Sequence, residues 1–414
     1  MVELDARAPL RIVLYGINFA PEPIGIGKYT GELAAWLVSR GHRVNVVTAP
    51  PYYPQWRILS GYRRHWYSRE RVDGAEVLRC PLYVPKVVRG RSRLTHLASF
   101  AATSGIAAIV KAIGGADIVI TIVPTFLSAP LGLLAARLSG AKAWLHVQDF
   151  EVDIALNSFL RVGKSAQRNV LRLETAVLRR FDRVSAITPR MVELAEKKGV
   201  KSERCVLLPN WVDTRSIFPI QGPNPVRLEL GEERRIALYS GNFGSKQGLE
   251  HLVEAARLLA HRRDILFVFC GDGAGRGELV AQATGMENVR ILGLRPQEEL
   301  NALLNAADLH LLPQRAEYAD LVMPSKLLGI LASGRPVIAC AHRGTQLSAV
   351  SDCCGISVEP ERPVEIARAV VRLVDDPAMR ASLGAAARSY AERNLDREVI
   401  LSEFERALFE VCRR

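Results

Sequence analysis

Two series of strand, glycine-containing loop and helix follow one another along this chain, and their repetition limits the fold more than any other feature. The first starts with LRIVLY at residues 10–15, continues through a loop containing GIGKYTG and a helix closed by Gly41, and ends in a second strand. The second starts with RIALYS at 235–240, followed by GNFGSKQG and another helix. Apolar strands alternating with helices are typical of a parallel sheet covered by helices. The sequence therefore predicts the α/β class, with two Rossmann-like doubly wound domains facing a cleft.

The length of 414 residues is too great for one simple core and favours two domains. Between residues 213 and 233 the periodicity lapses, and three prolines, Gly222 and Asn224 indicate a linker. We expect an N-terminal domain at 1–215, a C-terminal domain at 216–395 and a terminal amphipathic helix at 396–414.

A surplus of positive charge favours anionic partners: 55 lysines and arginines against 43 acidic residues leave a net charge of +12. Residues 51–93, the aromatic–arginine segment, mix aromatic side chains with arginines: Tyr52, Tyr53, Trp56, Arg57, Tyr62, Arg63, Arg64, Trp66, Tyr67, Arg69 and Arg71. An anionic membrane surface, single-stranded nucleic acid and plain solvent are three environments that suit this composition. The helix expected at 94–115 has small residues that favour packing on the sheet over membrane insertion.

The cysteines and the N-terminus indicate a cytoplasmic chain. The seven cysteines show no spacing typical of a metal site, and several lie in apolar strand segments, as reduced core thiols do. The N-terminal sequence lacks the basic-then-apolar layout of a signal peptide. No uninterrupted apolar run reaches the roughly 18 residues of a membrane-spanning helix.

Two stretches in the second half of the chain have the residues of a phosphate-binding site. Gly241, Gly244 and Gly248 can bring backbone amides to an anion, with Lys246 adding an ammonium group. Further on, PSKLLGILASGRPVIAC reads as loop, helix, turn and strand, with Pro324 in the first helical turn, Ser325 as a capping hydroxyl and Lys326 as a mobile charge. An ordinary βα unit with a surface lysine is the alternative interpretation.

In the first half, His146 and Gln148 are expected on one face of a strand, with Asp149 at its carboxyl end, where ligands of open α/β sheets bind. A buried core histidine is the alternative. Gly25 and Gly27 allow close backbone approach to a ligand. In a dinucleotide-binding fingerprint the glycines follow the first strand immediately, whereas these come about ten residues later. The second strand also ends without an acidic residue, so a nicotinamide enzyme is not expected.

Motifs along nearly the whole chain resemble a known enzyme family. PNWVD, SGNFGSKQGLEHLVEAARLL, FCGDG and PSKLLGILASGRPVIA resemble the C-terminal half of GT-B glycosyltransferases of family 4. YGINFAPEPIGIGKYTGELAAWLVSRGHRVNVVTAPPYYPQW is similar to the colanic-acid glycosyltransferases of that family, of the WcaI type. The resemblance implies retaining transfer from a GDP- or UDP-sugar, with fucose a candidate, and no required metal. It implies a lipid-linked saccharide acceptor at the inner membrane, an acceptor-binding first domain, a nucleotide-sugar-binding second domain, and a last helix that packs back on the first.

The family's residues transfer only in part. Its diphosphate-binding lysine corresponds to Lys246, but the usual arginine partner falls at Asn242. The two glutamates of the common signature fall at Leu321 and Gly329, so both carboxylates are missing. Two nearby acids, Glu317 and Asp320, could substitute for the missing glutamates. Gln247 follows the lysine directly.

The candidate site residues fall into three groups. The catalytic candidates are His146, Asp149 and Lys246; those for the donor are Gly25, Gly27, Gly241, Asn242, Gly244, Gly271, Asp272, Pro324, Ser325, Lys326 and Leu327; those for the acceptor are Glu22, Lys28, Tyr52 and Tyr53. The sequence contains no DxD triplet of the kind that a metal-dependent transferase uses. A sugar-nucleotide epimerase or hydrolase on the same fold is the alternative, as is a non-catalytic binder of anionic membranes or nucleic acid.

Overall fold

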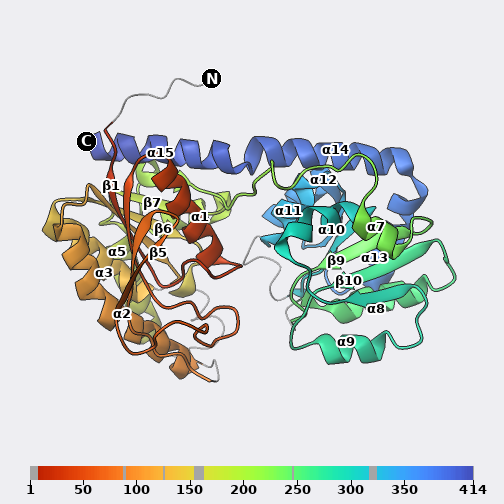
Figure 1. Ribbon diagram of the computed structural model, residues 1–414, viewed down its shortest axis with the longest axis horizontal. Coiled ribbons are helices and arrows are strands. Elements are labelled where there is room, and N and C mark those ends of the chain that lie inside the picture. The colour runs from red at the N-terminus through yellow and green to blue at the C-terminus, as the bar shows by residue number, and fades with distance from the viewer. Residues whose placement is uncertain are drawn as a thin grey trace. The chain divides into compact units, whose positions relative to one another are not determined.

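The computed structural model describes residues 8–86, 90–124, 126–152, 163–244, 247–316 and 324–413. It divides the chain into two compact units (Figure 1). Unit 1 comprises Met1–Asn210 and Leu401–Arg414, and unit 2 comprises Trp211–Ile400. The division falls a few residues before the expected boundary at 215, directly after the PN of the PNWVD motif.

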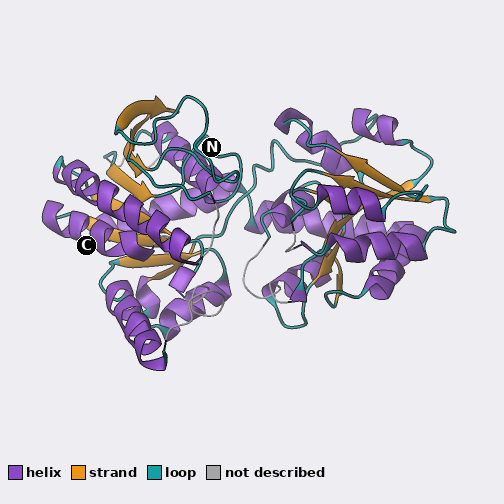
Figure 2. Ribbon diagram, turned by 90° about the horizontal axis from the view of Figure 1, so that it is seen from below, coloured by secondary structure: helices purple, strands orange, loops and turns teal. Residues whose placement is uncertain are grey.

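Unit 1 is built on an eight-stranded sheet with helices on both faces (Figure 2). Its strands, in the order β3-β4-β2-β1-β5-β6-β7-β8, are β1 (Arg11–Gly16), β2 (Arg43–Thr48), β3 (Ser68–Val72), β4 (Ala75–Arg79), β5 (Ile118–Val123), β6 (Lys142–Val147), β7 (Arg183–Ala186) and β8 (Cys205–Leu207). Its helices are α1 (Ile26–Ser39), α2 (Gly90–Ile113), η1 (Phe126–Ser128), α3 (Ala129–Ser139), α5 (Lys164–Leu178), α6 (Pro189–Lys197), η2 (Ser202–Arg204) and α15 (Arg397–Arg413), which belongs to this unit from Leu401 onward. All strand pairs are parallel except β3–β4.

The antiparallel pair β3–β4 lies within the aromatic–arginine segment, for which the sequence analysis predicted no strand. Asp73 and Gly74 join the two strands with positive φ angles of 46° and 83°. An Asp-Gly pair between short alternating segments is a typical hairpin signal, because both central residues of such a turn need positive φ. The many charged residues around it obscured this signal.

Alternate residues of each central strand in unit 1 face different helices. Tyr15 of β1 stacks on Phe100 of α2, with ring centroids 5.9 Å apart, and Leu145 of β6 belongs to the same core. Trp144 instead meets Phe404 of α15 edge-on at 5.1 Å. The C-terminal helix therefore completes the core of unit 1.

Unit 2 has a six-stranded, fully parallel sheet in the order β11-β10-β9-β12-β13-β14. The strands are β9 (Arg235–Ser240), β10 (Ile265–Cys270), β11 (Val289–Leu292), β12 (Leu309–Leu312), β13 (Val337–Cys340) and β14 (Gly355–Val358). The helices are α7 (Pro225–Leu230), α8 (Leu249–Leu258), α9 (Arg276–Gln282), η4 (Gln297–Glu299), α10 (Leu300–Ala306), α11 (Lys326–Ala332), α12 (Gln346–Cys354), α13 (Pro363–Asp375) and α14 (Pro377–Asn394). Central strands such as ILFVFC are buried throughout, as expected for a sheet covered on both faces.

The expected linker is more ordered than its composition suggested. Pro225–Leu230 forms α7, whose first turn is capped by Asn224: the side-chain Oδ1 accepts from the amides of Val226 and Arg227. A linker without a helix was predicted at 213–233 from the sequence, because a proline at the first helical position and an asparagine cap form a short helix without any long apolar period.

The free cysteines were anticipated from the sequence, which predicted no membrane-spanning helix. All seven cysteines are free, and Cys80, Cys270, Cys340 and Cys354 are buried. One described helical stretch, Ser92–Ile113 in α2, is long and apolar enough to cross a bilayer by length and composition. Because 44% of that stretch is buried inside the protein, the same values also suit a core helix.

We expect Phe404→Ala to lower the free energy of unfolding of unit 1 by about 3–5 kcal/mol, because it leaves a cavity against Trp144. Urea titration followed by tryptophan fluorescence measures this change. Arg406→Ala, at an exposed position of the same helix, is the matched control and should change stability by less than about 0.5 kcal/mol. Equal effects of the two substitutions would contradict the packing role of α15.

Candidate functional site

Glu22 links the two loops that follow β1 and β2. Its buried carboxylate accepts hydrogen bonds from the amides of Tyr52 and Tyr53, both at 3.0 Å, and from the side chain of Asn18 at 2.9 Å. Burial raises the pKa of Glu22, although these hydrogen bonds oppose the rise. A Cβ atom at Gly27 would lie 2.4 Å from Glu22 Oε2, so only glycine fits there. Glu22, predicted on the acceptor side, thus holds the backbone that presents the two tyrosines.

The other candidates near this loop differ in exposure. Gly25 precedes α1 with a φ of 67°, and a Cβ atom there would contact the Tyr53 ring at 3.5 Å. Tyr53 is 37% exposed, whereas Tyr52 is buried against Trp56. Lys28 lies on the partly exposed side of α1, 3.8 Å from Glu32. Tyr53 is therefore the tyrosine of this pair that is open to a ligand.

His146 lies at the carboxyl end of β6 in a chain of hydrogen bonds. Its Nε2 is 2.9 Å from Gln148 Nε2, and its Nδ1 is 2.9 Å from Ser185 Oγ. The Gln148 amide also donates to Asn210 Oδ1, and Asn210 donates back to Gln148. Since an amide NH₂ only donates, His146 Nε2 accepts, and the imidazole carries its proton on Nδ1. Burial lowers the pKa of His146 to about 3, so the ring is neutral.

Two acids follow β6 closely. Asp149 is half-buried, and Glu151 is buried beside Arg93, whose Nη2 lies 3.4 Å from Glu151 Oε1. Burial raises the pKa of Glu151 to about 7, although Arg93 opposes the rise. Asp149 was predicted from the sequence and Glu151 was not, although an acid shortly after a buried strand was a usable signal.

In unit 2 the loops after β9 and β10 touch through glycines. The amide of Gly241 donates to Cys270 O at 2.8 Å, and a Cβ atom at Gly271 would lie 1.8 Å from Gly241 O. The amide of Phe243 donates to Asp272 O at 2.8 Å. Gly241, Gly271 and Asp272 are thus brought together, as the predicted donor site requires.

Lys326 reaches into this pair of loops from the start of α11. Its Nζ donates to Tyr239 Oη at 2.6 Å and lies 4.2 Å from the centre of the Tyr239 ring. The tyrosine hydroxyl in turn donates to Asn242 O at 2.6 Å. A Cβ atom at Gly241 would lie 2.5 Å from Lys326 Cε, so the lysine passes directly over that glycine.

The ammonium group of Lys326 is unusual in its environment. Burial lowers the pKa of Lys326 to about 8. Described residues provide a hydroxyl and an aromatic face for it, but no carboxylate within ion-pair distance. Such a charge is stabilised when an anion binds beside it. Tyr239, which positions it, was missed from the sequence, although a tyrosine hydroxyl near the carboxyl end of an apolar strand was a signal.

The local structure around Lys326 differs from expectation. Helix α11 begins at Lys326, so Pro324 precedes the helix instead of lying in its first turn. The Ser325 side chain makes no capping hydrogen bond; the backbone closes the turn, with the Leu327 amide donating to Pro324 O at 3.0 Å. Leu327 is fully buried in the core and cannot meet a ligand with its side chain. The cap prediction failed because Ser325 has helical φ and ψ angles, unlike a typical capping residue.

Other candidates lie at the edge of the description. Lys246, Leu321, Glu317 and Asp320 fall outside the described residues. Gly244 lies close to Asn242 and to Gln247, whose Oε1 is buried without a hydrogen-bond partner among the described atoms. Gly329, the position of a missing family glutamate, lies within α11.

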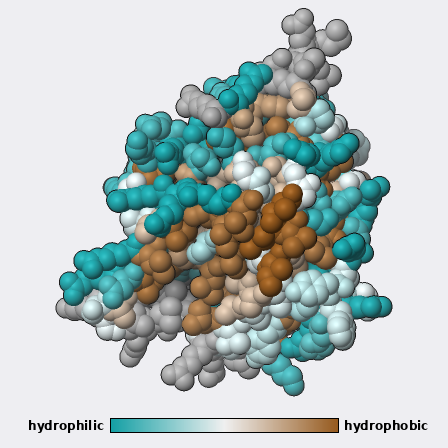
Figure 3. All heavy atoms as spheres, turned by 90° about the vertical axis from the view of Figure 1, so that its left-hand side faces the viewer, coloured by the Kyte–Doolittle hydropathy of each residue, from teal (hydrophilic) through white to brown (hydrophobic). Residues whose placement is uncertain are grey.

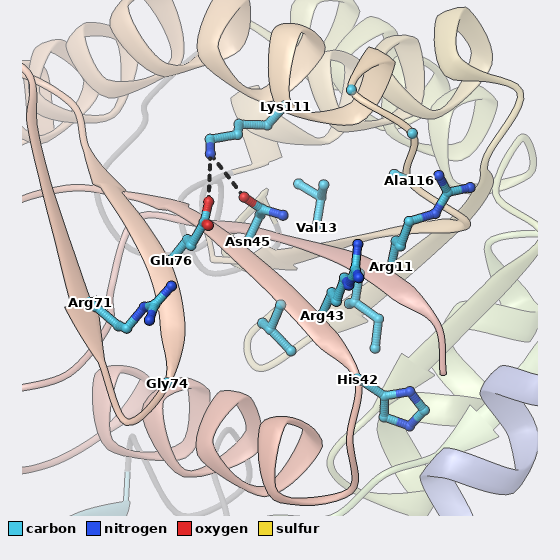
Figure 4. A pocket seen from close by; sticks show the side chains of 14 residues that line it. Arg11, Val13, His42, Arg43, Asn45, Arg71, Gly74, Glu76, Lys111 and Ala116 are labelled. Atoms are coloured by element: carbon cyan, nitrogen blue, oxygen red, sulfur yellow. Dashed lines mark hydrogen bonds and ion pairs between the residues drawn. The ribbon is translucent and has the colours of Figure 1, made fainter. Parts of the chain in front are cut away.

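A cavity of about 430 Å³ lies in unit 1 where strands β1 and β2 begin, away from the carboxyl ends of the strands (Figure 4). None of the candidate residues lines it. Arg11 and Arg43 begin β1 and β2 there, and Lys111 pairs with Asn45 at 2.9 Å and Glu76 at 3.2 Å. Ligands of open α/β sheets bind at the carboxyl ends of the strands, so this cavity is not the predicted site.

Comparisons with known proteins agree with this arrangement. Residues 25–211 match the glycosyl transferase 4-like domain, and residues 223–390 match the glycosyl transferases group 1 domain. The chain is 40% identical over 408 residues to the colanic acid biosynthesis glycosyl transferase WcaI of Escherichia coli strain K12, covering 95% of this chain and 98% of that protein.

Solved structures show the same fold at low sequence identity. Sucrose-phosphate synthase from Thermosynechococcus elongatus has a TM-score of 0.73 at 19% identity, over 97% of this chain and 99% of that one. Anabaena Alr3699/HepE in complex with UDP has a TM-score of 0.70 at 17% identity, over 97% and 100%. These are two-domain GT-B structures, so the predicted fold class is confirmed.

We expect pyrophosphate to bind more weakly at pH 9 than at pH 7, because Lys326, with a pKa of about 8, loses its charge in that range. The sign follows from the cationic form being the one that attracts the anion. Isothermal titration calorimetry measures the change. Lys326→Met is the control, since pyrophosphate's own titration remains there. An identical pH dependence in both proteins would show that Lys326 does not bind the anion.

Proposed function

Because this chain belongs to the glycosyltransferases of group 1, with the GT-B fold of family 4, we propose that it transfers a sugar from a GDP- or UDP-sugar to a lipid-linked saccharide. It is a glycosyltransferase, and the 40% identity to WcaI supports a place in colanic acid or related exopolysaccharide synthesis. The observation that carries the donor proposal is the buried ammonium group of Lys326 above Gly241.

The proposed chemistry uses Lys326 at the leaving group. Negative charge grows on the diphosphate as the bond to the sugar breaks, and a preorganised cation stabilises that charge most where water is excluded. Tyr239 holds the ammonium group in place, and the absence of a Cβ atom at Gly241 lets the Lys326 side chain pass directly over the backbone there. The family resemblance adds Lys246 as a second cation. We propose that these groups do the work without a required metal ion.

On the acceptor side, we propose roles for His146, Asp149 and Tyr53 in unit 1. His146 is neutral at physiological pH. Its ring can therefore accept a hydrogen bond from a sugar hydroxyl or donate one to it, but it carries no charge. Its Nε2 now accepts from Gln148, and a sugar hydroxyl would have to replace that amide as donor. A retaining transfer on the front face of the sugar needs no protein nucleophile, which suits a histidine used for positioning.

The acceptor class and location complete the proposal. WcaI is named for colanic acid biosynthesis, which supports a growing saccharide as acceptor. We propose that this saccharide is carried on a lipid, that fucose is one candidate sugar, and that the protein works at the cytoplasmic face of the inner membrane. The net charge of +12 suits an anionic membrane surface.

A thermal-shift panel of UDP, GDP and their sugars, GDP-fucose included, tests the donor. The nucleotide that binds the folded protein raises its melting temperature. We expect Lys326→Met and Lys246→Ala to lose most of that shift, whereas Arg368→Ala, which removes an exposed cation elsewhere in unit 2, keeps it. A full shift in both lysine variants would show that the donor site lies elsewhere.

A turnover assay with the donor so identified and a lipid-linked saccharide tests the reaction. We expect sugar transfer, with kcat/KM about a hundredfold lower in Lys326→Met, the usual loss when one stabilising donor is removed. Incubation without acceptor is the control: release of free sugar or of an epimer as the main product would identify a hydrolase or an epimerase.

A further inference from the structure

The outward face of α2 is apolar over much of its described length. Where burial is described for this helix, its exposed positions are all uncharged and mostly apolar: Leu94, Thr95, Ala98, Ala102, Ile106, Val110 and Ile113. Ile106 is 72% exposed, Val110 63% and Ile113 57%. The opposite face, with Phe100 and Ala108, is buried in the core of unit 1. A surface helix normally turns a polar face to water, so this face indicates a partner.

The apolar face continues onto the neighbouring helix. Helix α3 packs closely on α2: a Cβ atom at Gly105 would lie 2.9 Å from Leu131 Cδ1. Leu134 and Leu138 of α3 and Leu127 just before it are also exposed. Figure 3 shows apolar side chains gathered over this side of unit 1, with hydrophilic residues around them. We call the exposed apolar residues of α2, η1 and α3 the apolar face.

The aromatic–arginine segment borders this face. Tyr67 Oη donates to Thr103 O of α2 at 2.7 Å, which fixes the segment beside the helix. The neighbouring Trp66 is 71% exposed. Arg63 and Arg69 are exposed in the same segment, whereas Glu70 is already paired with the buried Arg79 at 2.6 Å. The border thus offers aromatic rings and positive charge.

We propose that the apolar face of α2 and α3 is the surface by which this protein docks on an anionic lipid bilayer. Apolar side chains would enter the boundary between headgroups and acyl chains, with α2 lying in the plane of the membrane. Trp66 and Tyr67 would lie in the partly hydrated headgroup layer, where amphipathic aromatic rings are favoured. The arginines would bind the anionic headgroups. Because one side of α2 is part of the protein core, the helix docks without spanning.

This inference extends the proposed membrane location and rests on it, but it assigns the contact to particular residues. It also adds to the expectation that α2 packs on the sheet: one side of the helix does, and the other is exposed. A second copy of the chain is the other occupant to be tested. The charged aromatic border favours lipid, because a symmetric contact would bring the same arginines together from both copies.

Sedimentation with vesicles tests the proposal on the full chain. We expect the protein to sediment with vesicles of phosphatidylglycerol and phosphatidylcholine, and less with phosphatidylcholine alone. The double variant I106E/V110E should partition at least about tenfold less, since two apolar side chains no longer enter the lipid. The variant I106S/V110S removes the same apolar area without adding charge and should also lose partitioning.

The matched control is L228E/L294E, which changes two leucines of unit 2 that are 57% and 72% exposed. We expect it to sediment like the unaltered protein. The nucleotide thermal shift, measured on every variant, verifies folding and keeps the two proposals apart: a protein that sediments but binds no nucleotide contradicts only the donor site. Unchanged sedimentation of both α2 variants, or none by the unaltered protein, would overturn the docking surface. So would a dimer in light scattering that both variants dissociate.

Discussion

The close approach of two backbone segments, at Gly241 and Gly271, is the constraint on which the donor side of this protein depends. A side chain at Gly271 would overlap the carbonyl oxygen of Gly241, and one at Gly241 would overlap Lys326. Two parallel strands can end this close together only where their loops carry no Cβ atom. This close approach places the Gly241 backbone directly beside the Lys326 ammonium group, the charge that we propose attracts a diphosphate.

Two buried ionisable groups in the two units show how burial serves different ends. The Glu22 carboxylate accepts hydrogen bonds from backbone amides, and these bonds hold together the loops that follow β1 and β2. Lys326 has only a hydroxyl and an aromatic ring beside it among the described residues, and its pKa falls to about 8. A buried charge with all its hydrogen bonds satisfied is structural, whereas one short of an opposite charge is suited to bind a ligand.

The apolar face of α2 and α3 follows the same logic on a larger scale. One side of α2 is needed for the core of unit 1, and this alone would account for an amphipathic helix. The exposed Ile106 and Val110 are not needed for the core, so the apolar character of this face requires another explanation. The exposed Trp66 in a segment fixed beside the same helix makes a bilayer the partner that fits best.

The amino-acid sequence by itself determined the class of fold, the division into two α/β units and the enzyme family. Strand and helix periods are local, and motifs such as PSKLLGILASGRPVIA are read without knowing their neighbours. Gly241, Asp272 and Lys326 could be named because each follows a strand or begins a helix. The hairpin at Asp73 and the helix at Pro225–Leu230 were also readable, but stronger charge and proline signals obscured them.

Only the tertiary structure decided how these groups act. Tyr239 and Lys326 are far apart in the chain, and their hydrogen bond exists because β9 and α11 pack in one unit. The neutral state of His146 follows from its burial, and its tautomer from its hydrogen bonds with Gln148 and Ser185. The sequence also could not show which side of α2 meets the core. Contacts between distant residues set these pKa values, hydrogen bonds and exposures, and no local pattern encodes such contacts.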